Sequence, residues 1–329
     1  MEPLTTVGGD ERSARITLAT LAAPGDPLTG KVFTGVGAVE TLRLLADDGL
    51  VPGLDGISAG LWRGRLRPQA ELDRVDSVME RTEQAGLRAL IPGDKDYPRG
   101  LNDLGYQAPY VLWAAGDTEL LGPLDAFAIT GTRHATAYGR QMASELAVDL
   151  VHDWGVVVAG GAYGIDAAVH ETALRKGGRT IAVVATGLDA LCWASGGERL
   201  EEIAAKGLLL SETPPGFEST LERVLARLKI EAAISGSVTL VEARDRSVSR
   251  AVVDRAHELG RPVGAVPGPV TSPVSEAPNE LIRDVGAAAI LNATDVMNIH
   301  YPKPDTPLRP APEPPQRPQA GPQHPSRGL

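Results

Sequence analysis

The chain has 329 residues, 43% of them apolar and 22% charged, which is typical of a globular protein with more than one domain. Its single cysteine, Cys192, excludes an intramolecular disulfide and a multi-cysteine zinc site, and we interpret it as a buried, unreactive side chain. The net charge of −10 argues against a large DNA-binding face but is compatible with a small basic pocket. No apolar run is long enough for a membrane span and no signal peptide is recognisable, so we expect a cytoplasmic protein.

Residues 1–95 are predicted to form a small helical accessory domain. Apolar periodicity indicates helices over residues 11–23, 35–49 and 72–86. The Gly35-Val36-Gly37 turn resembles the second half of a helix-hairpin-helix, in which backbone N–H groups face a phosphate. The alternative is that the two glycines only form the tight turn at the start of a helix.

Residues 96–302 alternate short β-branched runs with helical patterns, which predicts an α/β, Rossmann-like open sheet that is mostly parallel. The predicted strands cover residues 126–130, 156–159, 180–185, 208–211, 238–242 and 263–266. The predicted helices cover residues 140–153, 165–176, 200–206 and 250–259. The remaining residues, 303–329, are rich in proline and are expected to be disordered or extended, with a proline-rich docking motif as the alternative.

Glycine-rich loops follow several of the predicted strands. They contain Gly131, Thr132, Arg133, Thr136, Tyr138 and Gly139 in the first loop, Gly160, Gly161 and Gly164 in the second, then Gly187 and Gly268. In a parallel sheet the carboxyl ends of the strands meet at one edge, where glycines and helix starts expose backbone N–H groups to an anion. Arg133 adds a fork-shaped phosphate donor. The sequence therefore predicts one phosphate-holding crevice, although tight turns between strands and helices also need glycine.

Other phosphate and hydrolase chemistries are not indicated. The loops lack the Gly-x-Gly-x-x-Gly spacing of NAD sites and the Gly-x-x-x-x-Gly-Lys-Ser/Thr pattern of P-loops. No metal-binding histidine motif and no Gly-x-Ser-x-Gly elbow occurs. We therefore predict no cofactor, no metal site and no catalytic residues.

The motifs ITGTRHATAYG, VVAGGAYGIDAAVHETAL, RTIAVVATGLD, GRPVGAVPG and PNELIRDVGA, in this order, resemble the DNA-processing protein A family (DprA, also called Smf). The resemblance covers roughly residues 95–292. It implies a dimeric, non-enzymatic protein that binds single-stranded DNA and loads the RecA recombinase during natural transformation. It also implies that Arg133 binds phosphate, that Arg227 and Lys229 stand in the family's Arg-Asn-Arg motif, and that Ser247 and Ser249 stand in its Ser-Gly-Ser motif.

The chain departs from the family pattern in four places. The family's Arg-Asn-Arg appears as Arg227-Leu228-Lys229, and its Ser-Gly-Ser appears as Ser247-Val248-Ser249. Residues 190–194, which include Trp193, replace a Tyr-Pro and a basic residue, and the proline-rich segment stands where a winged helix is expected. These departures predict weaker DNA binding or a changed ligand. The alternative function is a nucleotide-phosphate enzyme or sensor related to phosphoribohydrolases, in which Arg133 would face Glu171, with His170 beside it.

Overall fold

The computed structural model describes residues 9–70, 72–122, 125–152, 155–189 and 196–302. Within them a nine-stranded sheet has the order β1-β2-β6-β5-β4-β3-β7-β8-β9. Its strands are β1 (Arg88–Leu90), β2 (Leu112–Gly116), β3 (Ala126–Thr130), β4 (Val156–Gly160), β5 (Arg179–Val183), β6 (Leu208–Ser211), β7 (Ser237–Leu240), β8 (Val263–Ala265) and β9 (Ala288–Ala289). β1 and β2 are antiparallel to each other, β2 is antiparallel to β6, and the other neighbours are parallel.

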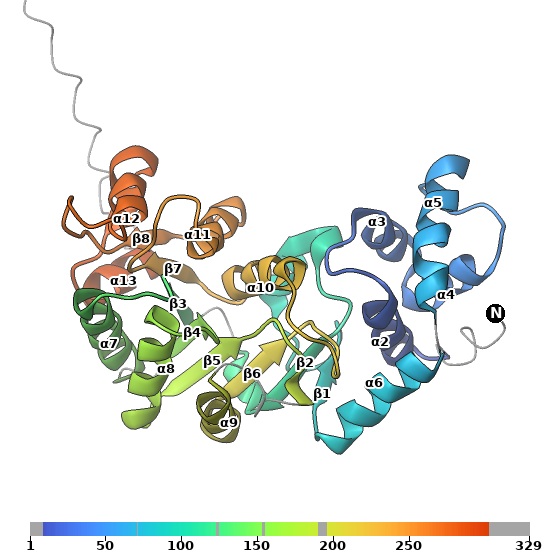
Figure 1. Cartoon of the computed structure of the whole chain (residues 1–329), viewed down its shortest axis with the longest axis horizontal. Coiled ribbons are helices and arrows are strands. Elements are labelled where there is room, and N and C mark those ends of the chain that lie inside the picture. The colour runs from blue at the N-terminus through green and yellow to red at the C-terminus, as the bar shows by residue number, and fades with distance from the viewer. Residues whose placement is uncertain (1–8, 71, 123–124, 153–154, 190–195, 303–329) are drawn as a thin grey trace, which may run out of the picture.

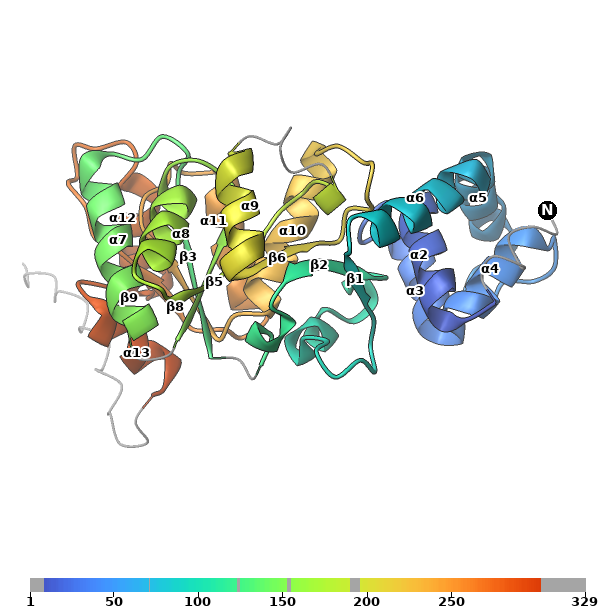
Figure 2. The ribbon, with the colours of Figure 1, turned by 90° about the horizontal axis from the view of Figure 1, so that it is seen from below.

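Helices cover both faces of this sheet, which confirms the predicted Rossmann-like architecture (Figures 1 and 2). One face is packed by α10 (Leu221–Ala233), α11 (Val248–Glu258) and α12 (Glu276–Glu280). The other is packed by α7 (Ala137–His152), α8 (Ile165–Arg175), α9 (Gly197–Lys206) and α13 (Ala293–His300). Short 3₁₀ and π turns complete the described helices: η1 (Arg67–Gln69), η2 (Arg99–Gln107), η3 (Thr118–Leu120) and η5 (Leu281–Val285).

The order of the strands creates a topological switch point at β3. β3 lies between β4, which follows it in the chain, and β7, which the chain reaches only after a crossover. The helix after β3 and the helix after β7 cover opposite faces, so the loops after β3 and β7 diverge at the carboxyl edge. Ligands of open α/β sheets commonly bind at such a switch point, whereas a cavity of this chain opens further along the same edge, at the ends of β4 and β5.

The N-terminal helices gather beyond the β1 edge of the sheet (Figure 2). They are α2 (Glu11–Leu21), α3 (Pro27–Val36), α4 (Ala38–Ala46), α5 (Gly56–Leu66) and α6 (Leu72–Gln84). Trp62 is fully buried among them, and its indole N–H donates to Thr29 Oγ1 over 3.0 Å. Gly37 caps α4 with a φ of 81°, a conformation that favours glycine. Phosphate contact at this turn stays a prediction.

The structure corrects several predicted boundaries. All six predicted strands and all seven predicted helices occur, but α3, α5, α10, α12 and α13 were not predicted, and neither were the strands β1, β2 and β9. β1 joins the sheet although it precedes residue 95, and the division into domains at that residue stays a prediction. Cys192, Trp193 and the segments 190–194 and 303–329 lie outside the described residues. Within the described chain, no helix has the length and apolar character of a membrane span.

Candidate anion-binding site

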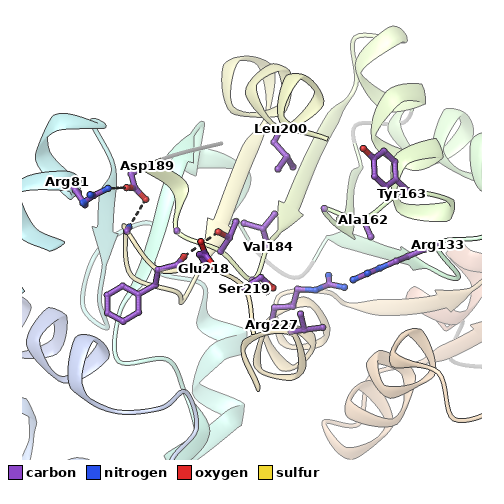
Figure 3. Close-up of a pocket in the computed structure, with 17 residues that line it drawn as sticks. Arg81, Arg133, Ala162, Tyr163, Val184, Asp189, Leu200, Glu218, Ser219 and Arg227 are labelled. Carbon is purple, nitrogen blue, oxygen red and sulfur yellow. Dashed lines mark hydrogen bonds and ion pairs between the residues drawn. The ribbon is translucent and has the colours of Figure 1, made fainter. Parts of the chain in front are cut away.

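A cavity of about 610 Å³ opens at the carboxyl ends of β4 and β5 (Figure 3). Its walls come from the second glycine loop (residues 161–163), the segment after β5 (184–187), the segment before α10 (216–219), and α10 itself. Part of the lining is apolar, with Val184, Leu200 and Phe217, and part is cationic. The cavity therefore offers both a surface for an aromatic or aliphatic group and donors for an anion.

Two arginines from different elements meet in this cavity. Arg133 is exposed and belongs to the first glycine loop, whereas Arg227 is buried and belongs to α10. Their guanidinium groups point toward each other (Figure 3). Among the described residues, no ion pair involves Arg133. Two facing guanidinium groups repel each other, so an anion placed between them would be stabilised by both.

Arg227 also holds buried carboxylates behind the cavity. Its Nη1 lies 2.9 Å from Glu231 Oε2 and 3.3 Å from the carbonyl oxygen of Val183. Burial raises the pKa of Glu231 to about 7 and that of Asp166 to about 6, against the opposing effect of Arg227. A Cβ on Gly160 would lie 2.0 Å from Arg227 Nη1, so glycine at the end of β4 leaves room for the guanidinium.

The first glycine loop is anchored by a buried carboxylate that sequence analysis missed. Glu242, which follows β7, accepts hydrogen bonds from the N–H (2.9 Å) and Oγ1 (2.5 Å) of Thr136, and its carbonyl accepts from the N–H of Thr132 (2.7 Å). A Cβ on Gly139 would lie 2.1 Å from Glu242 Oε2, and one on Gly131 would lie 2.5 Å from the Ile165 side chain. These residues shape the loop that carries Arg133.

The two glycine loops pack directly on each other. Gly164 has a φ of 82° and caps α8, and a Cβ there would lie 2.3 Å from the carbonyl oxygen of Thr132 and 2.5 Å from that of Arg133. The close approach fixes the loop of Arg133 relative to Gly161, which lines the cavity. Gly187 also lines it, and a Cβ there would lie 2.7 Å from the carbonyl oxygen of Pro214.

Other predicted site residues do not line the cavity. Lys229 is buried on α10 with its Nζ 3.1 Å from Glu212 Oε2, and it faces the N-terminal helices near Gly25. Ser247 caps α11 by accepting from the N–H of Arg250. Ser249 Oγ donates a hydrogen bond to the carbonyl oxygen of Gly131 (2.6 Å), and Tyr138 OH donates one to the carbonyl oxygen of Pro267 (2.8 Å). The Gly268 N–H donates to Asn279 Oδ1 (3.1 Å).

Several cavity residues were not predicted from the sequence. Arg81 comes from α6, and Phe217, Glu218 and Ser219 precede α10. The start of α10 had a recognisable signal, since Thr220 accepts from the N–H of Arg223 as a helix N-cap. Arg81 had none, because more than a hundred residues separate it from Asp189, with which it forms an ion pair of 2.8 Å.

His170 and Glu171, the residues of the enzymatic alternative, do not line the cavity. His170 is fully buried, its Nδ1 lies 2.7 Å from Thr180 Oγ1 and its Nε2 2.9 Å from the carbonyl oxygen of Gly160. Burial lowers its pKa to about 4. Glu171 has a side chain that is 57% exposed, and it pairs with Arg199 at 3.4 Å. No group of three or more metal-ligating side chains occurs within the part of the chain that the structure describes.

Comparison with known proteins gives consistent matches. The sequence model of a family described as DNA recombination-mediator protein A matches residues 88–300. The putative DNA processing protein DprA of Mycobacterium tuberculosis is 39% identical over 239 residues, which are 69% of this chain and 61% of that protein. DNA processing protein DprA of Bacillus subtilis is 32% identical over 237 residues, 70% of this chain and 79% of that protein. The match thus spans less than two thirds of the mycobacterial relative.

Two solved structures share the fold. The X-ray structure of DNA processing protein A from Streptococcus pneumoniae has a TM-score of 0.68 and 26% identity, and covers 86% of this chain and 95% of its own. A structure reported for the single-stranded DNA binding mode of DNA processing protein A from Helicobacter pylori has a TM-score of 0.58 and 31% identity. It covers 64% of this chain and 94% of its own.

Proposed function

This chain belongs to the DNA recombination-mediator protein A family, and we propose that it binds single-stranded DNA in the cavity between Arg133 and Arg227. The protein then acts as a recombination mediator, which delivers the strand to the RecA recombinase in DNA processing during natural transformation. It works in the cytoplasm as a homodimer and without a catalytic step.

The convergence of the two guanidinium groups carries this proposal. A backbone phosphate between Arg133 and Arg227 would receive fork-shaped donors from both sides (Figure 3). Apolar lining residues and the exposed ring of Tyr163, which is 54% exposed, give an unstacked base a surface to pack on. The bases of a duplex remain stacked inside the helix, so the concave site favours a single strand.

The predicted departure at residues 190–194 bears on affinity. The basic residue that the family usually carries there is replaced, so Arg133 and Arg227 must supply a larger share of the phosphate contacts. We therefore propose that binding depends steeply on Arg133, and less on contacts distributed over a broad basic face.

The enzymatic alternative has less support from the site. Hydrolysis of an N-glycosidic bond needs a carboxylate beside the developing charge on the sugar. Glu171 is largely exposed and paired with Arg199, and His170 has both ring nitrogens engaged in buried hydrogen bonds. Neither arrangement places a free general base at the cavity.

The test is anisotropy titration of labelled oligo-dT with the full chain and with Arg133→Gln at two salt concentrations. Loss of one single-strand phosphate contact lowers the salt slope by about 0.7, which corresponds to about fivefold weaker binding at about 0.1 M salt. Arg43→Gln, which removes an exposed arginine paired with Glu40 on the N-terminal helices, is the charge-matched control and should bind like wild type.

Two results would contradict the proposal. Unchanged affinity in a folded Arg133→Gln variant would remove Arg133 from the site. Release of free base from nucleoside monophosphates that Glu171→Ala abolishes, with no strand binding at low salt, would favour the enzymatic alternative instead.

A further inference from the structure

A second hollow, of about 350 Å³, lies next to the cavity and between the N-terminal helices and α10. Phe217 lines this hollow, and α6 supplies Arg74 and Arg81 to its wall while α10 supplies Arg223. The guanidinium carbon of Arg74 lies 4.4 Å from the Phe217 ring centroid, and that of Arg223 lies 4.8 Å from it. The ring thus holds two cations close together, and cation–π attraction stabilises each of them.

The hydrogen bonds of these two cations go to neutral acceptors. Arg74 donates to Gln69 Oε1 over 3.3 Å, and Arg223 donates to the carbonyl oxygen of Glu218 over 2.7 Å. Neither forms an ion pair with any carboxylate of the described residues. Burial, and then the neighbouring charge of Arg74, lower the pKa of Arg223, against the opposing effect of Glu222. A mobile anion is the partner that would relieve this repulsion.

The hollow adjoins the cavity of Arg133 and Arg227 and shares part of its wall. Arg81 and the segment 216–218 line both of them. Arg81 Nη1 binds Asp189 Oδ2 over 2.8 Å, and Asp189 Oδ1 accepts from the N–H of Gly216 over 2.8 Å (Figure 3). These contacts fasten α6 to the rim of the sheet, so the arginines of the hollow keep their position relative to the cavity.

We propose that Arg74, Arg223 and Phe217 form a second phosphate subsite, through which the N-terminal helices extend the path of a bound single strand. The inference rests on the proposed function and adds a separate part of the chain to it. The first nucleotides occupy the cavity, and the phosphates that follow reach the hollow past the segment 216–218. Glu218, which is exposed on that segment, places a repelling charge beside the path.

The experiment compares strands of about 6 and about 20 nucleotides, with the full chain carrying Arg74→Gln and Arg223→Gln together. On the long strand, loss of two phosphate contacts should lower the salt slope by about 1.4 and weaken binding about 25-fold at about 0.1 M salt. On the short strand the double variant should bind within twofold of wild type. Arg43→Gln is again the control, because it removes a positive charge elsewhere on the N-terminal helices.

A second variant removes a negative charge instead of a positive one, and it does so at an exposed side chain. Glu218→Gln should strengthen binding of both strands, because Glu218 lines the cavity as well as the hollow and its charge repels phosphates in either place.

The outcomes separate the two proposals. If wild type binds neither strand, the proposed function fails and the subsite fails with it. If Arg133→Gln weakens both lengths while the double variant alters neither, only the second subsite is overturned. Equal weakening of both lengths by the double variant also overturns it, since the hollow would then not lie beyond the cavity.

Discussion

The buried carboxyl of Glu231 should make the protein less stable as the pH rises. Its side chain is 0% exposed, Oε2 lies 2.9 Å from Arg227 Nη1, and Oε1 has no hydrogen-bond partner among the described residues. Burial raises its pKa from the ordinary 4.5 to about 7, because the single guanidinium of Arg227 does not repay the loss of solvation.

The direction and the size of this change in the free energy of unfolding follow from proton linkage. Between pH 4.5 and about 7 the unfolded chain has released the Glu231 proton while the folded protein still holds it, so the free energy of unfolding falls as the pH rises. The loss is complete above about pH 7 and amounts to roughly 3 kcal/mol. Glu231→Gln has no such proton. The variant should therefore gain roughly 3 kcal/mol relative to wild type across this window.

Urea unfolding of both proteins at several pH values from about 4.5 to about 8 measures this difference. His170, whose folded pKa of about 4 also shapes the wild-type curve, is present in both proteins and contributes to both. Asp166 acts on the charge of Glu231, so its interaction with that carboxyl is part of the difference between the two proteins. Glu202→Gln, an exposed residue that pairs with Lys206 on α9, is the control and should track wild type. Curves for wild type and Glu231→Gln that stay parallel from acid to alkaline pH would refute the reasoning.

Two further substitutions test the packing around the site. Gly164→Ala should cost more than about 1 kcal/mol in urea unfolding and weaken strand binding, because φ is 82° and the new Cβ would lie 2.3 Å from the Thr132 carbonyl; wild-type stability would contradict this. Lys229→Met should lower the free energy of unfolding by about 3–5 kcal/mol, because it leaves the buried carboxylate of Glu212 without its cation. The affinity of the folded fraction for oligo-dT should stay unchanged. A loss of affinity for oligo-dT in the folded variant would show that Lys229 contributes to the binding site.

The sheet was predictable where its strands carry their own signal. β3 and β4 are runs of apolar residues buried on both faces, and helices follow each of them. β1 and β9 have only three and two residues, and β2 pairs antiparallel with β6, which lies far along the chain. Such strands form because a partner is present, and that partner cannot be found by inspecting local periodicity.

The site was predictable at the glycines and less so at the cations. Gly160 and Gly164 sit where the backbone contacts neighbouring groups, and this requirement is local to each loop. Arg227 and Lys229 stand two positions apart on α10, about 200° around the helix axis, so they face opposite surroundings. One meets the cavity and the other meets Glu212, a distinction that needs the packed neighbours of the helix.

The effect of the net charge of −10 likewise depends on where the charged residues lie. Arg12, Arg65 and Arg88 are neutralised by aspartates in ion pairs, whereas Arg133 and Arg223 have no carboxylate partner among the described residues. Screening limits the reach of exposed charges to about 10 Å at about 0.1 M salt, so acidic residues on distant surfaces do not cancel the field at the cavity. A phosphate at the carboxyl edge responds to its nearest arginines. Under the proposed function, the overall charge therefore restricts how far a bound strand extends across the surface, while the arginines of the cavity remain able to bind a phosphate.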